Sequence, residues 1–309
     1  MIKVLFVVGP TASGKTSLSI ELAKKYNGEI ICADSMQIYK GIQIASAAPT
    51  LDEKEGIPHH LFEFLNLDEQ FSVAEYVKLA RERITEVSSR NKLPIVVGGT
   101  GLYISALLDN TQFTEQDVDL HLRKMLETQF DELGGEEMLR RLSLFDKDSA
   151  LRLHPNNRRR IIRCFEVYNQ TGKTITEHNL SSKQDKGDIL PLVIGVNFSN
   201  RELLYERINK RVDIMLENGL LDEAAKNFEL SSKSGAFQAI GHKELYGYIK
   251  GECSLQDAIE HLKQQTRRYA KRQLTWFRRD QRINWFYPDT QPDFLEKVFN
   301  FTNKNLKEE

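Results

Sequence analysis

The sequence predicts an α/β protein in which helices flank a parallel sheet and an all-helical domain is inserted into the chain. Short apolar runs alternate with helical patterns through the first hundred residues, an order that is typical of parallel sheets covered on both faces. A glycine-rich turn follows the first run directly, where a helix is expected to begin. The expected strands are residues 2–8, 29–33 and 94–97, and the expected helices are residues 16–26 and 72–87.

The pattern changes near Phe113, and from there only helices are expected until a polar connector at residues 181–190. Strand character returns at residues 192–196, and the chain then reads as helical from about residue 201 to residue 279. We therefore expect two domains. The α/β core comprises residues 1–112 and 188–309 with its basic C-terminal helices, and the helical insertion comprises residues 113–187.

Composition excludes several classes of protein. The 309 residues are 40% hydrophobic and carry a net charge of -1, values typical of a globular chain with a core. No apolar run is long enough to span a membrane. Cys32, Cys164 and Cys253 are far apart and form no CxxC pair, which argues against a zinc site or a disulfide scaffold. We expect a cytoplasmic protein without a membrane partner.

A phosphate-binding loop follows the first strand, which makes the core similar to P-loop NTPases. Its strand and helix context fits G-x-x-x-x-G-K-[ST], and its backbone N–H groups are expected to hold a diphosphate or triphosphate. Lys15 adds a positive charge, and the Thr16 hydroxyl is the expected ligand of Mg²⁺. A chance turn between strand and helix is the alternative. The loop residues are Gly9, Pro10, Thr11, Ala12, Ser13, Gly14, Lys15 and Thr16.

One carboxylate follows an expected core strand. Asp34 comes after residues 29–33, whereas the strand at 94–97 ends in Gly98-Gly99-Thr100, without the acidic residue that an ATPase needs. Ligands of parallel sheets bind beyond the carboxyl ends of the strands, so Asp34 and Thr100 are expected beside the phosphate loop. Asp34 is therefore a candidate general base, and a turn cap is the alternative interpretation.

Basic residues gather in two segments of this nearly neutral chain. One lies between Lys263 and Arg282, where Leu262, Tyr269 and Trp276 are expected to form the buried stripe of a helix. The residues alone leave two interpretations open, a footprint for nucleic-acid phosphates and a solvated helix face with salt bridges. The second segment contains Arg158, Arg159, Arg160 and Arg163.

Taken together, these motifs resemble the bacterial tRNA dimethylallyltransferase family, also called tRNA isopentenyltransferase. The resemblance covers roughly residues 4–280 and rests on an ordered series of motifs. The series is the phosphate loop, Asp34-Ser35-Met36-Gln37-Ile38-Tyr39, Pro58-His59-His60-Leu61, Phe71-Ser72-Val73-Ala74, Val97-Gly98-Gly99-Thr100-Gly101-Leu102-Tyr103, His154-Pro155-Asn156, Arg160 with Arg163, Thr171-Gly172-Lys173, Ile240-Gly241 with Lys243-Glu244, and Lys271-Arg272-Gln273-Leu274-Thr275-Trp276.

The resemblance implies a reaction. A dimethylallyl group would move from dimethylallyl diphosphate to N6 of the adenosine at position 37, 3′-adjacent to the anticodon of tRNA. Asp34, Thr100 and Lys15 would be catalytic, and Arg211 would hold the diphosphate. The tRNA anticodon arm would contact Asp34, Ser35, Met36, Gln37, Thr100, Arg123, Arg158, Arg159, Arg160, Ile161, Ile162, Ala239, Ile240, Gly241, His242, Lys243 and Glu244.

The chain departs from the family pattern at several positions. The family often has Gly-Thr-Ala-Lys-Pro where residues 45–49 read Ala-Ser-Ala-Ala-Pro, so Ala48 cannot make the phosphate contact of a lysine. Asn157-Arg158-Arg159-Arg160 replaces the usual Asp-Pro-Gln-Arg, and His242 stands where tyrosine is common. Eukaryotic members carry a further zinc finger, which is not expected here. We expect a monomer.

Three other functions are compatible with parts of the sequence. A small-molecule P-loop kinase would account for the phosphate loop and Asp34 but not for the basic helices. An adenylate prenyltransferase would need neither the basic insertion nor residues 267–279. A non-enzymatic RNA-binding protein would not require intact Lys15, Thr16, Asp34 and Thr100.

Overall fold

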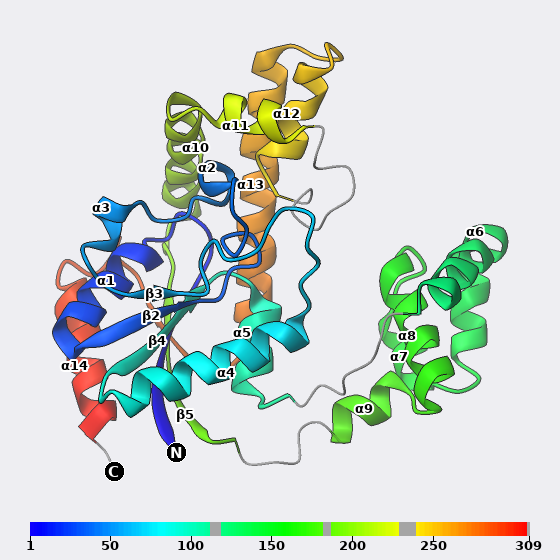
Figure 1. The fold of residues 1–309 in the computed structure, drawn as a ribbon, viewed down its shortest axis with the longest axis horizontal. Coiled ribbons are helices and arrows are strands. Elements are labelled where there is room, and N and C mark those ends of the chain that lie inside the picture. The colour runs from blue at the N-terminus through cyan, green and yellow to red at the C-terminus, as the bar shows by residue number, and fades with distance from the viewer. Residues whose placement is uncertain (112–118, 182–186, 229–238, 308–309) are drawn as a thin grey trace. The chain divides into compact units, whose positions relative to one another are not determined.

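The structure is a computed structural model that describes residues 1–111, 119–181, 187–228 and 239–307 (Figure 1). Six strands are described: β1 Ile2–Val8, β2 Gly28–Cys32, β3 His59–His60, β4 Leu93–Gly98, β5 Ile189–Val196 and β6 Ile283–Phe286. The helices of the α/β part are α1 Lys15–Tyr26, α2 Gln43–Ser46, α3 Leu51–Lys54, α4 Val73–Ser89, α5 Gly101–Leu108, α10 Arg201–Glu217, α11 Leu220–Asn227, α12 His242–Ile249, α13 Leu255–Phe277 and α14 Phe294–Lys307. The remaining helices are α6 Leu120–Leu142, α7 Lys147–Arg152, α8 Arg158–Thr171 and α9 Ile175–Ser181.

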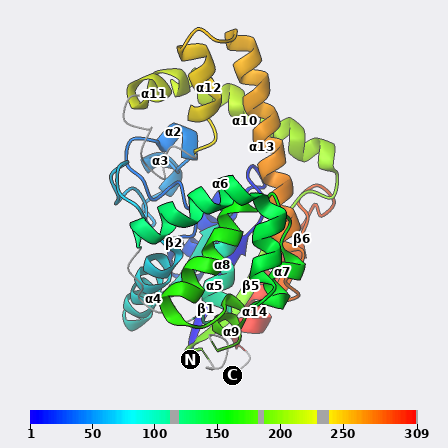
Figure 2. The ribbon, with the colours of Figure 1, turned by 90° about the vertical axis from the view of Figure 1, so that its right-hand side faces the viewer.

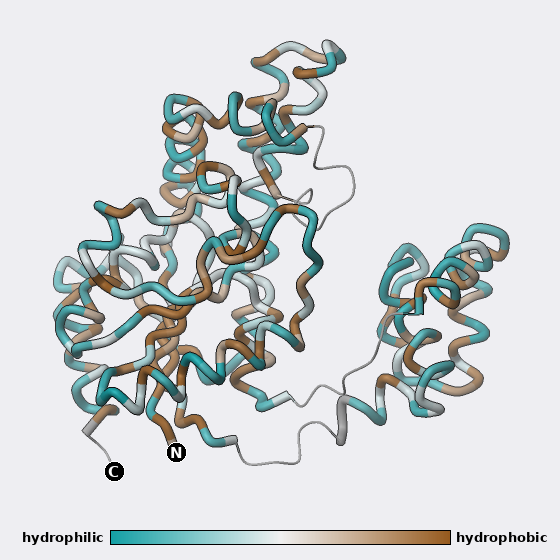
Figure 3. Tube along the Cα trace, viewed as in Figure 1, coloured by the Kyte–Doolittle hydropathy of each residue, from teal (hydrophilic) through white to brown (hydrophobic). Residues whose placement is uncertain are grey.

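The six strands form one parallel sheet in the order β3-β2-β4-β1-β5-β6. The central strands are apolar on both faces, as expected for strands that helices cover on each side. Their hydrophobic character is visible as the brown centre of Figure 3. The predicted fold class is therefore confirmed.

Alternate residues of β1 enter two different cores. Val4, Phe6 and Val8 pack with apolar residues of α4 and α5. Leu5 and Val7 point to the other face and pack with apolar residues of α1 and α14. This alternation is the period of two that a strand imposes, and it explains why nearly the whole of β1 is buried.

Helix α4 begins where the sequence predicts. Ser72 is its N-cap, and the Ser72 hydroxyl accepts a hydrogen bond from the backbone N–H of Glu75 at 3.2 Å. The Glu75 carboxylate accepts a hydrogen bond from the Ser72 N–H at 2.7 Å, which completes a capping box. A cap of this kind contributes about 1 kcal/mol to helix stability.

The helices near the C-terminal end of the chain form a second layer of the α/β part. Helix α13 packs against α10 and α12, and α11 packs against α12 (Figures 1 and 2). Leu204 and Ile208 of α10 meet Ala270 of α13 in a small core that also contacts Ala12 of the phosphate loop. This core connects the α10–α13 layer to the loop.

The chain divides into two compact units. One comprises residues 1–108 and 188–309, and the other comprises residues 109–187. The second unit contains helices α6 to α9, with a kink at Gly134. The predicted boundary between residues 112 and 113 lies outside the described residues, and residue 187, which the sequence assigns to the insertion, falls in the second unit.

One expectation for the C-terminal region was wrong. Trp276 does not belong to the buried stripe of α13, because it is 38% exposed and the stripe is completed by Ala270, Gln273 and Phe277. The chain also has an edge strand, β6, after residue 279, in a region for which the sequence predicted no element. Among the described residues no helix is long and apolar enough to cross a membrane.

Candidate active site

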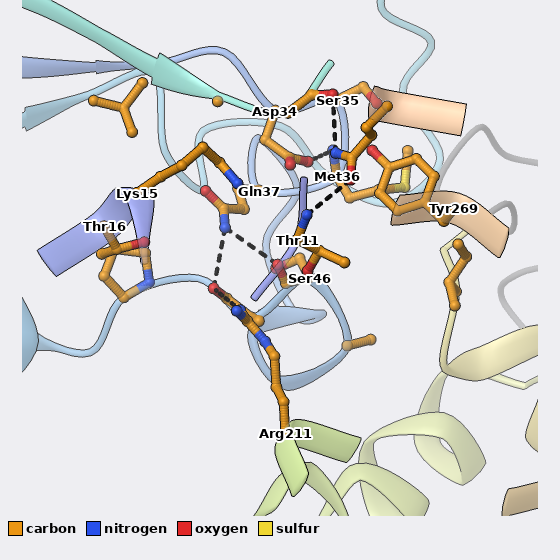
Figure 4. A pocket seen from close by; sticks show the side chains of 18 of the residues that line it. Thr11, Lys15, Thr16, Asp34, Ser35, Met36, Gln37, Ser46, Arg211 and Tyr269 are labelled. Carbon is orange, nitrogen blue, oxygen red and sulfur yellow. Dashed lines mark hydrogen bonds between the residues drawn. The ribbon is translucent and has the colours of Figure 1, made fainter. Parts of the chain in front are cut away.

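A central cavity of about 350 Å³ lies at the carboxyl ends of the parallel strands (Figure 4). We call it the central cavity. Many of its lining residues come from the phosphate loop with α1, from the segment after β2, from α10 and α13, and from the start of α12. Its lining includes Thr11, Lys15, Thr16, Asp34, Ser35, Met36, Gln37, Arg211, Ile240, Lys243, Tyr269, Arg272 and Gln273.

The phosphate loop runs from the end of β1 to the first residue of α1. Gly14 is the N-cap of α1, has a φ of 95° and offers no side-chain cap, so the first turn of α1 keeps free N–H groups. Such a helix start attracts anions. The Thr11 N–H is already committed, because it donates to the Gln273 Oε1 at 2.8 Å. The loop therefore presents N–H donors that can bind an anion, although one of them, the Thr11 N–H, already donates to Gln273.

Among the described residues, Lys15 and Arg211 are two of the four positively charged residues that line the central cavity, with Lys243 and Arg272. Lys15 Nζ donates to the Pro10 carbonyl oxygen at 2.6 Å, and Arg211 reaches in from α10. Burial, together with the charge of Arg211, lowers the pKa of Lys15 to about 7, although Asp34 raises it. Burial also lowers the pKa of Arg211. An anion bound between these two side chains would stabilise both in their charged forms.

The same two residues line a second cavity of about 690 Å³. Thr16 and Ala47 also line both cavities. Arg207 and Lys210 add positive charge to the second cavity, and Arg207 Nε donates to the carbonyl oxygen of Ala12 at 3.0 Å. Positively charged side chains therefore lie near the phosphate loop in both cavities.

Asp34 follows β2 directly, as predicted, and its carboxylate lies on the same cavity as Lys15 and Arg211. Burial raises the pKa of Asp34 above its ordinary value, against the hydrogen bond from the Met36 N–H at 2.9 Å and the attraction of Lys15. A carboxylate with a raised pKa is a stronger base than an exposed one, so Asp34 is suited to accept a proton.

Thr100 holds the segment that follows Asp34. The Ser35 N–H donates to the Thr100 Oγ1 at 2.9 Å, and the Thr100 hydroxyl donates to the Ser35 Oγ at 3.3 Å. Thr100 is not among the described residues that line the central cavity. Its position therefore indicates that it orients the Asp34–Ser35 segment, and direct contact with the reacting groups remains an expectation.

Gln37 lines the central cavity, but its amide is already occupied. Gln37 Nε2 donates to the carbonyl oxygens of Ser46 at 3.2 Å and Ala47 at 3.0 Å. The Cys32 thiol lies 3.7 Å from Gln37 Oε1, where it can donate a weak hydrogen bond. Met36 and Ser35 line the cavity beside it. Gln37 thus supports the cavity wall, and its contact with the target base stays a prediction.

The expected tRNA-contact stretch 239–244 is only partly accessible. The side chains of Ile240 and Lys243 line the central cavity. The side chains of Ala239, His242 and Glu244 are buried, and Glu244 accepts a hydrogen bond from the Gly241 N–H at 2.8 Å. These three side chains therefore pack within the fold, and contact of these residues with tRNA stays a prediction.

The basic residues expected to contact tRNA in the helical unit differ in their surroundings. Arg123 and Arg163 both pair with Glu166, and Arg158 pairs with Asp131 at 2.9 Å. Arg159 and Arg160 are exposed in the first turn of α8. The side chains of Ile161 and Ile162 are buried in the core of the unit, so their side chains are not presented to RNA.

Helix α13 supplies residues that sequence reasoning did not assign to the site. Gln273 is buried and bridges the phosphate loop to β4, because its Nε2 also donates to the Gly99 carbonyl oxygen at 2.9 Å. The Tyr269 hydroxyl interacts with the side chains of Thr100 and Gln273, and burial raises the pKa of Tyr269. The glycine run after β4 was the available signal: a side chain at Gly99 would collide with Gln273, and one at Gly101 with Trp276.

The basic residues of α13 and of the two positions after it are partly engaged in contacts with other residues. Lys263 pairs with Asp213 at 2.8 Å, and Arg267 Nη1 donates to the Asn209 Oδ1 at 2.6 Å. Arg268, Lys271, Arg278 and Arg279 are exposed, and Arg272 lines the central cavity. The segment therefore combines packing against α10 with a charged surface.

The fold and the central cavity define a P-loop NTPase-like α/β protein in which the phosphate loop and the Asp34 carboxylate border one cavity. A sequence model described as IPP transferase matches residues 37–280, and the chain belongs to this family. The resemblance inferred from the motifs is therefore confirmed.

Known proteins with high similarity carry the corresponding names. The tRNA dimethylallyltransferase of Acetivibrio thermocellus is 48% identical over 99% of this chain and 97% of its own length. The tRNA dimethylallyltransferase of Bacillus subtilis is 46% identical over 92% and 90% of the two chains.

Solved structures agree with the fold. The tRNA isopentenylpyrophosphate transferase of Bacillus halodurans is 40% identical, covers 100% of this chain and 98% of its own, and gives a TM-score of 0.74. A eukaryotic dimethylallyltransferase described as acting on tRNA is 32% identical, covers 99% of this chain and 79% of its own, and gives a TM-score of 0.83.

Proposed function

We propose that this protein is a tRNA dimethylallyltransferase. It transfers the dimethylallyl group of dimethylallyl diphosphate to N6 of adenosine 37, next to the anticodon, and releases diphosphate. The observation that carries this proposal is the placement of Asp34 on one cavity with Lys15, Arg211 and the phosphate loop. Membership of the family and the names of the relatives support it.

The reaction breaks one bond and forms another. The bond between C1 of the allylic group and the diphosphate oxygen breaks, and C1 bonds to N6 of the adenine. The proton that N6 loses goes to the Asp34 carboxylate. Burial favours this transfer, because it raises the pKa of Asp34 and so makes its carboxylate a better proton acceptor.

The main barrier is the departure of the diphosphate, because an allylic carbon tolerates positive charge. Lys15, Arg211 and the N–H groups at the start of α1 would stabilise the negative charge that develops on the leaving group. Fixed donors aimed at developing charge contribute about 2.7–4 kcal/mol each when they are tested by removal. The carboxyl-edge location of all three agrees with this role.

Thr16 is the residue that would hold Mg²⁺. Its hydroxyl lies beside Lys15 on the cavities that the diphosphate would enter, and Mg²⁺ commonly takes one or two protein oxygens and completes its shell with phosphate and water. The site therefore fits the ion. When bound, the ion would neutralise part of the charge on the diphosphate.

The apolar part of the central cavity suits the remaining substrate groups. Ile30, Phe62 and Val97 line it together with Met36. A volume of about 350 Å³ lies in the range of small-molecule sites. The target adenine is stacked in an anticodon loop, so it must be flipped out of the stack to reach Asp34.

We expect the protein to act in the cytoplasm, where tRNA is used, and to be a monomer.

The test is a direct assay. The protein is incubated with dimethylallyl diphosphate, Mg²⁺ and an anticodon stem-loop containing adenosine 37, and the nucleosides are analysed by mass spectrometry. We expect N6-(dimethylallyl)adenosine at that position and no consumption of added ATP. Prenylation of AMP as fast as of the stem-loop would favour an adenylate prenyltransferase, and ATP consumed in proportion to product would favour a kinase.

A further inference from the structure

Helix α2 has an N-terminal cap that comes from a distant part of the chain. The helix spans only Gln43–Ser46, and its N-cap, Ile42, has no side-chain oxygen to accept a hydrogen bond. Glu223 of α11 supplies one: its Oε2 accepts from the Ile44 N–H and its Oε1 from the Ala45 N–H, both at 2.9 Å. Glu223 thus satisfies donors that the start of a helix leaves open.

The other end of α2 faces the central cavity. Ala47 ends the helix with a φ of 49° and a ψ of 47°, a left-handed conformation that is unfavourable for alanine. Its carbonyl oxygen accepts hydrogen bonds from Gln37 Nε2 at 3.0 Å and from Arg211 Nη2 at 3.2 Å (Figure 4). One carbonyl group therefore orients both a residue of the base-facing segment and the arginine of the diphosphate site.

Glu223 is itself held in place. It is about 10% exposed, and His242 Nε2, almost fully buried, lies 2.9 Å from the Glu223 Oε1. Asn227, one turn further along α11, donates to the Gly41 carbonyl oxygen at 2.7 Å. The contacts of Glu223 and Asn227 fix the segment from Gly41 to Ala47 onto α11, a helix that is distant from it in the sequence.

The geometry points to Glu223 as a positioning residue for the transfer reaction. By capping α2 it fixes the Ala47 carbonyl group, and through that group it sets the side chains of Gln37 and Arg211 for the acceptor base and the diphosphate. This inference rests on the proposed function. It also assigns a role to His242, which orients the carboxylate of Glu223.

The carboxylate is required because of its hydrogen-bonding capacity. Both oxygens of Glu223 accept, and the two backbone N–H groups of α2 can only donate. In Glu223→Gln one oxygen is replaced by an NH₂ group, which is also a donor, so one N–H group of α2 is left without its partner. The cap weakens, and the Ala47 turn is free to move away from Gln37 and Arg211.

The test compares Glu223→Gln with Asp222→Asn. Asp222 is the neighbouring acid in the first turn of α11 and is exposed, so its change removes the same charge without touching α2. For Glu223→Gln we expect KM for dimethylallyl diphosphate and for the stem-loop to rise about tenfold, equivalent to ~1.4 kcal/mol, with kcat at saturation within about threefold of wild type. Asp222→Asn should match wild type. Unchanged KM values in Glu223→Gln would overturn the inference.

A double-mutant cycle separates positioning from simple loss of stability. Glu223→Gln and Gln37→Ala are measured singly and together by calorimetric titration with inorganic diphosphate. Because both act through the Ala47 carbonyl group, the double variant should bind more tightly than the sum of the single effects predicts. Strict additivity would overturn the inference.

Two further measurements cover the cases in which Glu223→Gln does not fold and in which the protein prenylates no RNA. If Glu223→Gln does not fold, Glu223→Asp is used; its shorter carboxylate keeps the charge but does not reach both N–H groups, and an intermediate rise in the diphosphate dissociation constant is expected. Wild-type affinity in Glu223→Asp would overturn the inference. If the wild-type protein binds diphosphate but prenylates no RNA, the proposed function fails, whereas the titrations still decide the role of Glu223.

Discussion

The Ser35 N–H donates a hydrogen bond to the Thr100 Oγ1 at 2.9 Å, which joins the ends of the adjacent strands β2 and β4 directly beside Asp34. Asp34 is consequently held from both sides, since the Met36 N–H donates to its Oδ1. A carboxylate fixed in this way needs little rearrangement before it accepts a proton, which is the form of catalysis that preorganised sites use.

Replacing Asp34 by asparagine should abolish most of the activity while leaving the fold intact. The amide has the same size but does not accept the N6 proton, and general base catalysis typically contributes about 10²–10⁴-fold to the rate. Single-turnover prenylation of the stem-loop measures the effect. Asp68→Asn, an exposed acid, is the matched control. Near-normal turnover in Asp34→Asn would remove Asp34 from the mechanism.

The same variant should be more stable than the wild type at neutral pH. Burial raises the pKa of Asp34 above its ordinary 3.8, so the folded protein binds the proton more tightly than the unfolded chain does. Ionised Asp34 therefore costs stability above its folded-state pKa, and this cost fades as the pH falls toward 3.8. Thermal unfolding at about pH 7 and about pH 4 should show a higher Tm for Asp34→Asn at neutral pH and a smaller difference at acidic pH.

The prenylation rate should fall as the pH is lowered, whereas the stability cost of ionised Asp34 fades. Protonation removes the base form of Asp34, so activity should decline on acidification, beginning at a higher pH than for an exposed aspartate. An equal stability gap between wild type and Asp34→Asn at both pH values would contradict the assignment of a raised pKa.

Gln273→Leu should weaken both the fold and the phosphate loop. Gln273 is buried and accepts from the Thr11 N–H at 2.8 Å while it donates to the Gly99 carbonyl oxygen at 2.9 Å. Leucine leaves both backbone groups without a partner, at a cost of about 1–3 kcal/mol each. Urea unfolding measures the loss, and donor KM should rise because the loop shifts. Gln264→Leu, at an exposed position of the same helix, is the control; equal stability of the two variants would refute the bridging role.

Local patterns predicted β1, β2, β4 and β5 and the position of Asp34, because these features depend on neighbouring residues. β1, β2 and β4 are apolar runs that end at glycine or shortly before Asp34, and the capping box of α4 is contained within four residues. The parallel order then places the phosphate loop and Asp34 at one edge of the sheet without further information.

The rest of the site depends on contacts between distant residues, which no local pattern records. Gln273 meets Thr11 across 262 positions, and Glu223 meets Ile44 across 179 positions. The heptad spacing of Leu262, Tyr269 and Trp276 suggested one buried stripe. However, α13 packs against α10, α12 and the glycine run after β4, so its buried face turns to Ala270, Gln273 and Phe277. Strand β6 is four residues long, too short for a periodicity to be recognised.

The last prediction is that tRNA affinity depends strongly on salt, whereas diphosphate affinity does not. One flipped adenine in the central cavity cannot account for binding of a whole anticodon arm, so phosphate contacts must supply the remainder, and exposed Arg159, Arg160, Arg268 and Lys271 are the candidates. Each neutralised phosphate releases counterions, and log K falls with log salt by about 0.7–0.9 per phosphate. With about four to six neutralised phosphates, a fourfold rise in salt should weaken stem-loop binding by about 50- to 2,000-fold.

The contribution of the helical unit can be isolated within this experiment. Reversing Arg159 and Arg160 to glutamate should raise the dissociation constant for the stem-loop and lower the slope of its salt dependence by about 0.7–0.9 for each phosphate that is no longer neutralised. Lys147→Glu, which reverses an exposed charge of the same unit, should leave the slope unchanged. Inorganic diphosphate should bind wild type and both variants alike, because its expected contacts lie at Lys15 and Arg211. Equal weakening of stem-loop and diphosphate binding would mean that α8 stabilises the fold and does not hold RNA.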